Sequence, residues 1–202
     1  MKPDEILSKL KQNYPQVKCA LNHNNAYELA VSTILSAQCT DKRVNTVTLK
    51  LFAKYPNVND LANANIEEVK SIIRSTGFYN AKAKNIIEFA KSIVENFNGI
   101  VPETLDELIK LPGVARKTAN VILGVWYKKS EGIAVDTHVR RLSKLLGLTL
   151  HNDPVKIEKD LMKVFPQCEW DYISLALIQY GRDYCKARKH DTSKCFLGGH
   201  KR

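Results

Sequence analysis

The sequence predicts an all-α protein of about ten helices. Apolar residues recur at three- and four-residue spacings along most of the chain, which is the period of an amphipathic helix. Alternation of apolar and polar residues with a period of two, bounded by turn signals, does not occur. The seven prolines fall between the apolar-periodic stretches and not within them.

The expected helices follow one another from the N-terminus with short connections. The first five are marked by Ile6, Leu7 and Leu10; Leu29, Ile34 and Leu35; Val44, Val47, Leu51 and Phe52; Val69, Ile72 and Ile73; and Ile86, Ile87, Phe89, Ala90, Ile93 and Val94. The later helices are expected over 105–109, 117–126, 138–146, 155–165 and 170–180.

Length and composition exclude several classes of protein. A chain of 202 residues fits one large domain or two small ones, and 44% hydrophobic residues exclude a fully disordered or fibrous chain. No stretch approaches the roughly 20 apolar residues that span a bilayer, so no membrane partner is expected. Asp4 and Glu5 stand where a signal peptide needs an apolar run, so export is not expected and a cytoplasmic protein is favoured.

The charge and the cysteines indicate the kind of partner and site. The formal net charge of +10 favours a polyanionic partner, and half of that excess lies within 182–202. That segment would otherwise be an ordinary solvated tail. Five cysteines are an odd number in a chain without an export signal, which favours cytosolic thiols or a metal site over disulfides.

The segment 108–120, LIKLPGVARKTAN, predicts a helix, a tight turn and a second helix. Pro112 fixes φ and Gly113 permits a positive φ, so this pair forms the turn. The second helix is expected to begin near Ala115 and Arg116, where its free N–H groups suit a DNA phosphate. An ordinary pair of antiparallel helices is the alternative interpretation.

Two polar residues after this turn suggest chemistry at a sugar carbon. Lys117 lies in the first turn of the second helix, where the helix dipole disfavours an ammonium and leaves the amine as a nucleophile. Asp136 directly precedes a later helix and is expected to be its N-cap. A fixed carboxylate beside such an amine suits attack at C1′ of a nucleotide. Taken singly, a surface lysine and a capping aspartate are the commoner interpretation.

Five segments together resemble the endonuclease III family of helix-hairpin-helix DNA glycosylases. They are AVSTILSAQCTDKRVN at 30–45, STGFYNAKAKNI at 75–86, LPGVARKTAN at 111–120, VDTHVRRLSKLLGL at 135–148 and GRDYCKARK at 181–189. Their order and separations match the family along nearly the whole chain. The hairpin alone would be only moderately specific.

The resemblance implies a role for particular residues. Lys117 matches the Schiff-base lysine, Asp136 the catalytic aspartate, and His138 a structural histidine beside it. Gln38 matches the glutamine that fills the gap left by a flipped base, and Phe78 an apolar wedge. Further DNA contacts are implied for Leu111, Gly113, Ala115, Arg116, Lys186 and Arg188.

Two features depart from the family pattern. Ala115 replaces the second glycine of the hairpin, and alanine is tolerated where a helix starts with negative φ.

The second departure concerns the metal ligands. The family holds a [4Fe–4S] cluster with the cysteine pattern Cys-x6-Cys-x2-Cys-x5-Cys. Counted from Cys185, the other three ligand positions carry Thr192, Cys195 and Lys201, so we expect no cluster and no other cofactor. A candidate zinc set has an unusual spacing and consists of Cys185, His190, Cys195 and His200.

The resemblance implies two helical lobes with a DNA-binding cleft between them. One lobe, 21–131, has six helices and contains the helix-hairpin-helix motif at about 104–128. The other joins 1–20 to 132–202 and ends in a vestigial cluster segment at 185–202.

The implied function is that of a bifunctional DNA glycosylase and AP lyase of base-excision repair, acting as a monomer. It would remove oxidised pyrimidines from duplex DNA and cleave the abasic strand by β-elimination. A related glycosylase for 8-oxoguanine and a non-catalytic DNA-binding module are the alternatives. Lys117 argues against the branch that removes adenine opposite 8-oxoguanine, because that branch lacks the lysine.

Overall fold

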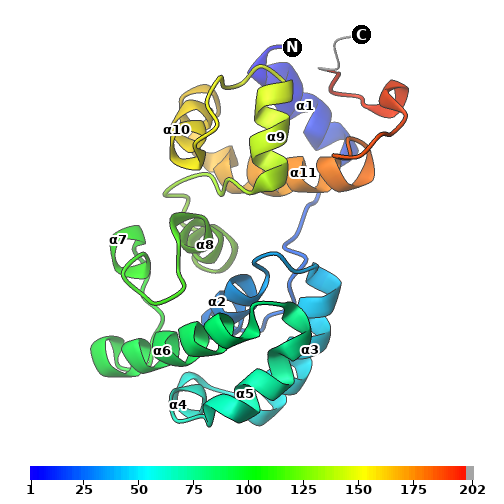
Figure 1. Cartoon of the computed structure of the whole chain (residues 1–202). Coiled ribbons are helices and arrows are strands. Elements are labelled where there is room, and N and C mark those ends of the chain that lie inside the picture. The colour runs from blue at the N-terminus through cyan, green and yellow to red at the C-terminus, as the bar shows by residue number, and fades with distance from the viewer. Residues whose placement is uncertain (199–202) are drawn as a thin grey trace. The chain divides into compact units, whose positions relative to one another are not determined.

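A computed structural model describes residues 1–198, and the regular elements in that range are all helical, which confirms the all-α prediction (Figure 1). The described residues form eleven α-helices, and the one that the apolar pattern does not predict is the five-residue α4 (Val58–Ala62). The chain divides into two compact units, Ala20–Lys129 and Met1–Cys19 with Ser130–Arg202. None of the described helices is long and apolar enough to cross a bilayer.

The unit Ala20–Lys129 is organised around α2 (Ala26–Leu35). Every residue of α2 is buried, as expected of a helix that is covered on all sides. Its neighbours are α3 (Asp41–Lys54), α6 (Tyr79–Phe97) and α8 (Arg116–Ile122). The remaining helices are α4, α5 (Ile66–Ile73) and α7 (Leu105–Leu108), and α8 continues into a π-helical turn, η2 (Leu123–Tyr127).

Side-chain caps fix where most helices of this unit begin. Asparagine and threonine side chains accept a hydrogen bond from a backbone N–H group of the first turn, which satisfies a donor that the helix itself leaves unpaired. The capping residues are Asn25, Thr40, Asn57, Asn65 and Thr104. The N-cap of α8, Ala115, provides no such side chain.

The other unit packs α9 (Thr137–Leu145), α10 (Pro154–Val164) and α11 (Trp170–Asp183) with the N-terminal helix α1 (Pro3–Asn13). Figure 1 shows α9 crossing α11. At Gly181 of α11 a Cβ atom would lie 2.7 Å from His138 Nδ1 of α9, so the close crossing requires glycine there. Both prolines in the helices of this unit, Pro3 and Pro154, stand at a helix start, where a missing N–H costs nothing.

The C-terminal segment belongs to the core of this second unit. Cys185, Cys195 and Leu197 are buried in one cluster with Leu10 of α1 and Leu177 of α11. The ring of Phe196 packs against the rings of three tyrosines, Tyr14, Tyr180 and Tyr184, with centroid separations of 6.3, 4.8 and 5.3 Å. The segment up to Gly198 is therefore held by apolar packing against α1 and α11.

Candidate functional site

The turn between α7 and α8 confirms the predicted helix-hairpin-helix. Gly113 has a φ of +76°, and a Cβ there would lie 3.0 Å from Asn85 Cβ on α6, so both backbone conformation and space require glycine. The Val114 N–H donates to Leu111 O at 3.1 Å and closes the turn. Ala115 has a φ of −83°, which explains why alanine is tolerated at the position of the second family glycine.

The side chains around this turn divide into buried and accessible ones. Leu111 is only 4% exposed, so it packs inside the unit and offers only its main chain to a phosphate. Gly113 and Ala115 are exposed, and Arg116 is half-buried. No side chain caps α8, so the N-terminal end of this helix presents backbone N–H groups and the positive end of its dipole.

Lys117 lies in the first turn of α8, two residues after the N-cap Ala115. Its side chain is half-buried, whereas Thr118 and Ala119, the next two residues, are buried. The buried side of α8 thus fixes the helix in the unit and leaves the lysine at the margin of its surface.

Asp136 is the N-cap of α9, as predicted. Its Oδ1 accepts a hydrogen bond of 2.8 Å from the Val139 N–H. The preceding residues, Ile133, Ala134 and Val135, are buried, and Ser174 Oγ of α11 donates to Ala134 O at 2.8 Å. The chain is anchored on both sides of Asp136, so the half-buried carboxylate has a fixed position in its unit.

Gln38 and Phe78 share an unusual backbone conformation. Both are non-glycine residues with positive φ, +52° and +48°, which is uncommon and strained for a bulky aromatic residue. Gln38 follows the end of α2 and is exposed, and Phe78 is the N-cap of α6 with 68% of its surface exposed. A strained backbone that exposes an aromatic ring is typical of a residue with a binding role.

One buried lysine connects the two segments that carry Gln38 and Phe78. Lys82 of α6 is 5% exposed, and its Nζ donates to Leu35 O at 2.8 Å and to Thr76 O at 2.9 Å. Leu35 ends α2, three residues before Gln38, and Thr76 precedes Gly77 and Phe78. Burial lowers the pKa of Lys82 below that of an exposed lysine.

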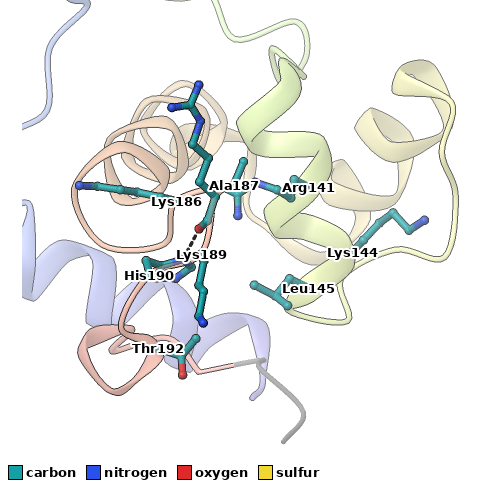
Figure 2. Close-up of a pocket in the computed structure, with 9 residues that line it drawn as sticks. Arg141, Lys144, Leu145, Lys186, Ala187, Lys189, His190 and Thr192 are labelled. Carbon is teal, nitrogen blue, oxygen red and sulfur yellow. Dashed lines mark hydrogen bonds between the residues drawn. The ribbon is translucent and has the colours of Figure 1, made fainter.

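Basic side chains surround a hollow of about 730 Å³ in the second unit (Figure 2). Its cationic lining residues are Arg141, Lys144, Lys186, Arg188 and Lys189. Lys186 and Arg188, two of the residues for which the family resemblance implies a DNA contact, are exposed here. Such a concentration of cations without an acidic lining residue suits the phosphates of a nucleic acid.

Comparisons with known proteins identify the family. The HhH-GPD superfamily of base excision DNA repair proteins matches residues 31–167. The endonuclease III of Synechocystis sp. is 51% identical over 193 residues, covering 96% of this chain and 88% of the relative. The endonuclease III of Bacillus subtilis is 45% identical, covering 95% and 87%. A solved non-covalent endonuclease III–DNA complex has a TM-score of 0.92 at 41% identity, covering 98% of this chain and 94% of that one.

The chain belongs to the endonuclease III family. It is therefore a base-excision repair enzyme, a DNA glycosylase with AP lyase activity. This confirms the fold and the activity that the sequence implies. It also makes the hairpin before Lys117 the family's helix-hairpin-helix motif.

The cluster ligands of the endonuclease III family do not fit this chain. Thr192 is an exposed residue at the start of a 3-10 turn, and a hydroxyl is not a substitute for an iron-binding thiolate. Lys201 and His200 lie outside the described residues. What the structure does bring together is Cys185, His190 and Cys195, whose ligand atoms all lie within 4.8 Å of one another. Burial raises the pKa of the Cys195 thiol.

The role of Lys82 was not predicted from the sequence, although a signal exists. Lys82 precedes Ile86, Phe89 and Ile93 at spacings of four, seven and eleven residues, which places it on the buried face of its helix. A lysine on an apolar face must find acceptors or lose its charge. The pattern therefore predicts a buried partner but not which carbonyl groups provide it.

Replacement of Lys82 by methionine should weaken both the fold and base excision. Methionine fills similar space but leaves Leu35 O and Thr76 O without this donor. The free energy of unfolding measured in urea should therefore fall by about 1–3 kcal/mol. The rate of single-turnover excision should fall by about tenfold or more, because the Gln38 and Phe78 segments are no longer held in place. Lys84→Met, an exposed change on the same helix, is the matched control. Equal behaviour of the two variants would contradict this role of Lys82.

Proposed function

We propose that this enzyme removes oxidised or fragmented pyrimidines from duplex DNA, with Lys117 as nucleophile and Asp136 as the assisting carboxylate. The observation that carries the proposal is the placement of both groups at helix N-termini on rigid segments. Lys117 follows the hairpin directly, and Asp136 is held by the Val139 N–H.

The chemistry proceeds through an imine. The Lys117 amine attacks C1′, the bond from C1′ to the base breaks, and the base leaves with the proton that the amine loses. The bond from C1′ to O4′ of the sugar ring then breaks as O4′ takes up a proton, which leaves the imine between Lys117 and C1′. The Asp136 carboxylate stabilises the positive charge that develops at the sugar. Loss of a proton from C2′ of the imine then breaks the bond between C3′ and its phosphate oxygen, which cleaves the strand 3′ to the site.

Gln38 and Phe78 act on the DNA duplex rather than on the reacting bond. Extrusion of a base costs a few kcal/mol of stacking and pairing. An exposed aromatic ring and an amide, each on a constrained backbone, can replace part of that loss by entering the gap. The exposed main chain of the hairpin and the basic side chains Lys186 and Arg188 bind the phosphates. We propose that the protein acts as a monomer in the cytoplasm, associated with the nucleoid, and works without a [4Fe–4S] cluster.

Borohydride trapping tests the nucleophile. If Lys117 forms the imine, reduction should link the protein covalently to abasic duplex DNA, and Lys117→Gln should abolish the linked species while duplex affinity changes less than about threefold. Lys110→Gln, an exposed lysine before the same turn, should trap normally. Undiminished trapping by Lys117→Gln would assign the nucleophile to another residue, and no trapping by the unmodified chain would favour a non-catalytic DNA-binding module.

Substitution of Asp136 separates its two roles. Asparagine caps a helix as well as aspartate does, so Asp136→Asn should unfold at nearly the same urea concentration as the parent. Excision should fall by about 100-fold or more because the charge is lost. Asp136→Ala should in addition lose about 1 kcal/mol of stability. Near-normal turnover of Asp136→Asn would leave the residue as a cap only.

Alanine variants of Gln38 and Phe78 test the gap-filling role. Each should lower excision from a single-lesion pyrimidine duplex by about tenfold or more, since a few kcal/mol of extrusion cost is no longer offset. Binding to undamaged duplex should change little. Leu49→Ala removes another exposed apolar side chain of the same unit, 76% exposed, and should leave excision unchanged. Parallel losses in excision and nonspecific binding would make these two residues general DNA contacts.

A further inference from the structure

Three metal-binding side chains meet in the C-terminal segment of the second unit. Cys185 follows α11, Cys195 follows the 3-10 turn Thr192–Lys194, and His190 lies in the connection between them. Their ligand atoms lie within 4.8 Å of one another, although four residues separate each from the next along the chain. The chain thus turns back on itself so that two thiols and one imidazole face a common point.

The imidazole of His190 is oriented for a metal. Its Nδ1 lies 2.8 Å from Arg188 O, a hydrogen bond drawn in Figure 2. Because a carbonyl can only accept, Nδ1 carries the proton and Nε2 presents its lone pair. Nε2 lies 3.3 Å from Cys195 Sγ, close to the separation of about 3.5 Å between nitrogen and sulfur ligands of a tetrahedral zinc ion.

The two cysteines lie in a closed site. Cys185 is fully buried and Cys195 is 6% exposed. Arg141 of α9 approaches Cys185 Sγ with Nη1 at 3.6 Å and binds Cys185 O with Nη2. The bond from Arg141 to Cys185 O fixes the backbone at this ligand.

We propose that Cys185, His190 and Cys195 bind a single zinc ion in place of the family's iron–sulfur cluster. Two thiolates and a neutral imidazole cancel the charge of Zn²⁺ and are the ligand types that it prefers, with water in the fourth position. Binding displaces the two thiol protons to solvent, including the one that Cys195 Sγ directs at Tyr184 O, 3.7 Å away.

A single ion suits this arrangement better than a cluster. In a four-iron cluster each thiolate binds a different iron, so the distances between the metals add to the separation of the ligands. Donor atoms that all lie within 4.8 Å of one another leave room for one ion among them. The exposed Thr192 at the second cluster position points to the same conclusion.

The zinc ion would also constrain a basic loop. Lys186, Arg188 and Lys189 lie between the ligands Cys185 and His190, and all three line the basic hollow. A metal that closes this loop holds the three cations at one edge of the hollow. Less conformational entropy is then lost when the loop binds DNA. This consequence rests on the proposed contact with DNA, whereas metal binding itself does not.

Metal analysis of the full chain tests the proposal. Protein purified without chelator should contain about one zinc and no stoichiometric iron per chain, and Co²⁺ should replace zinc with the visible absorption of a tetrahedral thiolate site. Removal of zinc by a strong chelator should lower Tm by about 5 °C or more, and one equivalent of Zn²⁺ should restore it. A lower affinity of the chelated protein than of the zinc-loaded protein for duplex DNA would support the inference that zinc orders the basic loop.

Variants distinguish this site from chance binding. Cys185→Ser and Cys195→Ser should each lose the zinc, and His190→Gln should weaken zinc binding by about tenfold or more. Cys168→Ser changes an exposed cysteine and should retain one zinc per chain. Circular dichroism shows which variants still fold, and the measurements on the unmodified chain do not depend on them. A chain that takes up no Zn²⁺, or that contains about four irons, would overturn the proposal.

Discussion

The hydrogen bonds of the buried Lys82 ammonium are the constraint on which the positions of the Gln38 and Phe78 segments depend. Two backbone carbonyls from separate segments, Leu35 O and Thr76 O, accept from one nitrogen. The end of α2 and the start of α6 are thereby held at a fixed separation. Gln38 and Phe78, both with positive φ, lie directly beyond these points. A conformation of that kind persists only where the surrounding structure determines the backbone firmly.

This arrangement explains why a charged group is retained in a well-packed interior. An unpaired ammonium would be costly to bury, but donation to two carbonyls satisfies it and satisfies the carbonyls in return. Leu35 O also lies at the C-terminal end of α2, where the helix dipole favours a cation. An apolar side chain at position 82 would fill the space without joining the two segments.

Much of the site could be predicted because it depends on local rules. Pro112–Gly113 specifies a turn, a capping aspartate specifies the start of α9, and both are found where the sequence places them. The partners of Lys82 and the meeting of Cys185, His190 and Cys195 could not be predicted in the same way. They depend on long-range packing, α6 against the end of α2 in one case and Arg141 of α9 against the C-terminal segment in the other. Spacing along the chain does not determine such contacts.

Contacts that involve no metal hold the C-terminal segment in the core of the second unit. Phe196 and Leu197 provide an apolar anchor on α1 and α11, and Arg141 holds the backbone at Cys185. These contacts fix the segment independently of any ion, so replacement of cluster cysteines need not release it from the core. The same anchors keep Cys185 and Cys195 buried and close together, which limits the site to what two thiols and a neighbouring histidine can bind. Because the basic residues Lys186, Arg188 and Lys189 are exposed on that anchored segment, they are accessible to a nucleic acid whichever residues stand at the cluster positions.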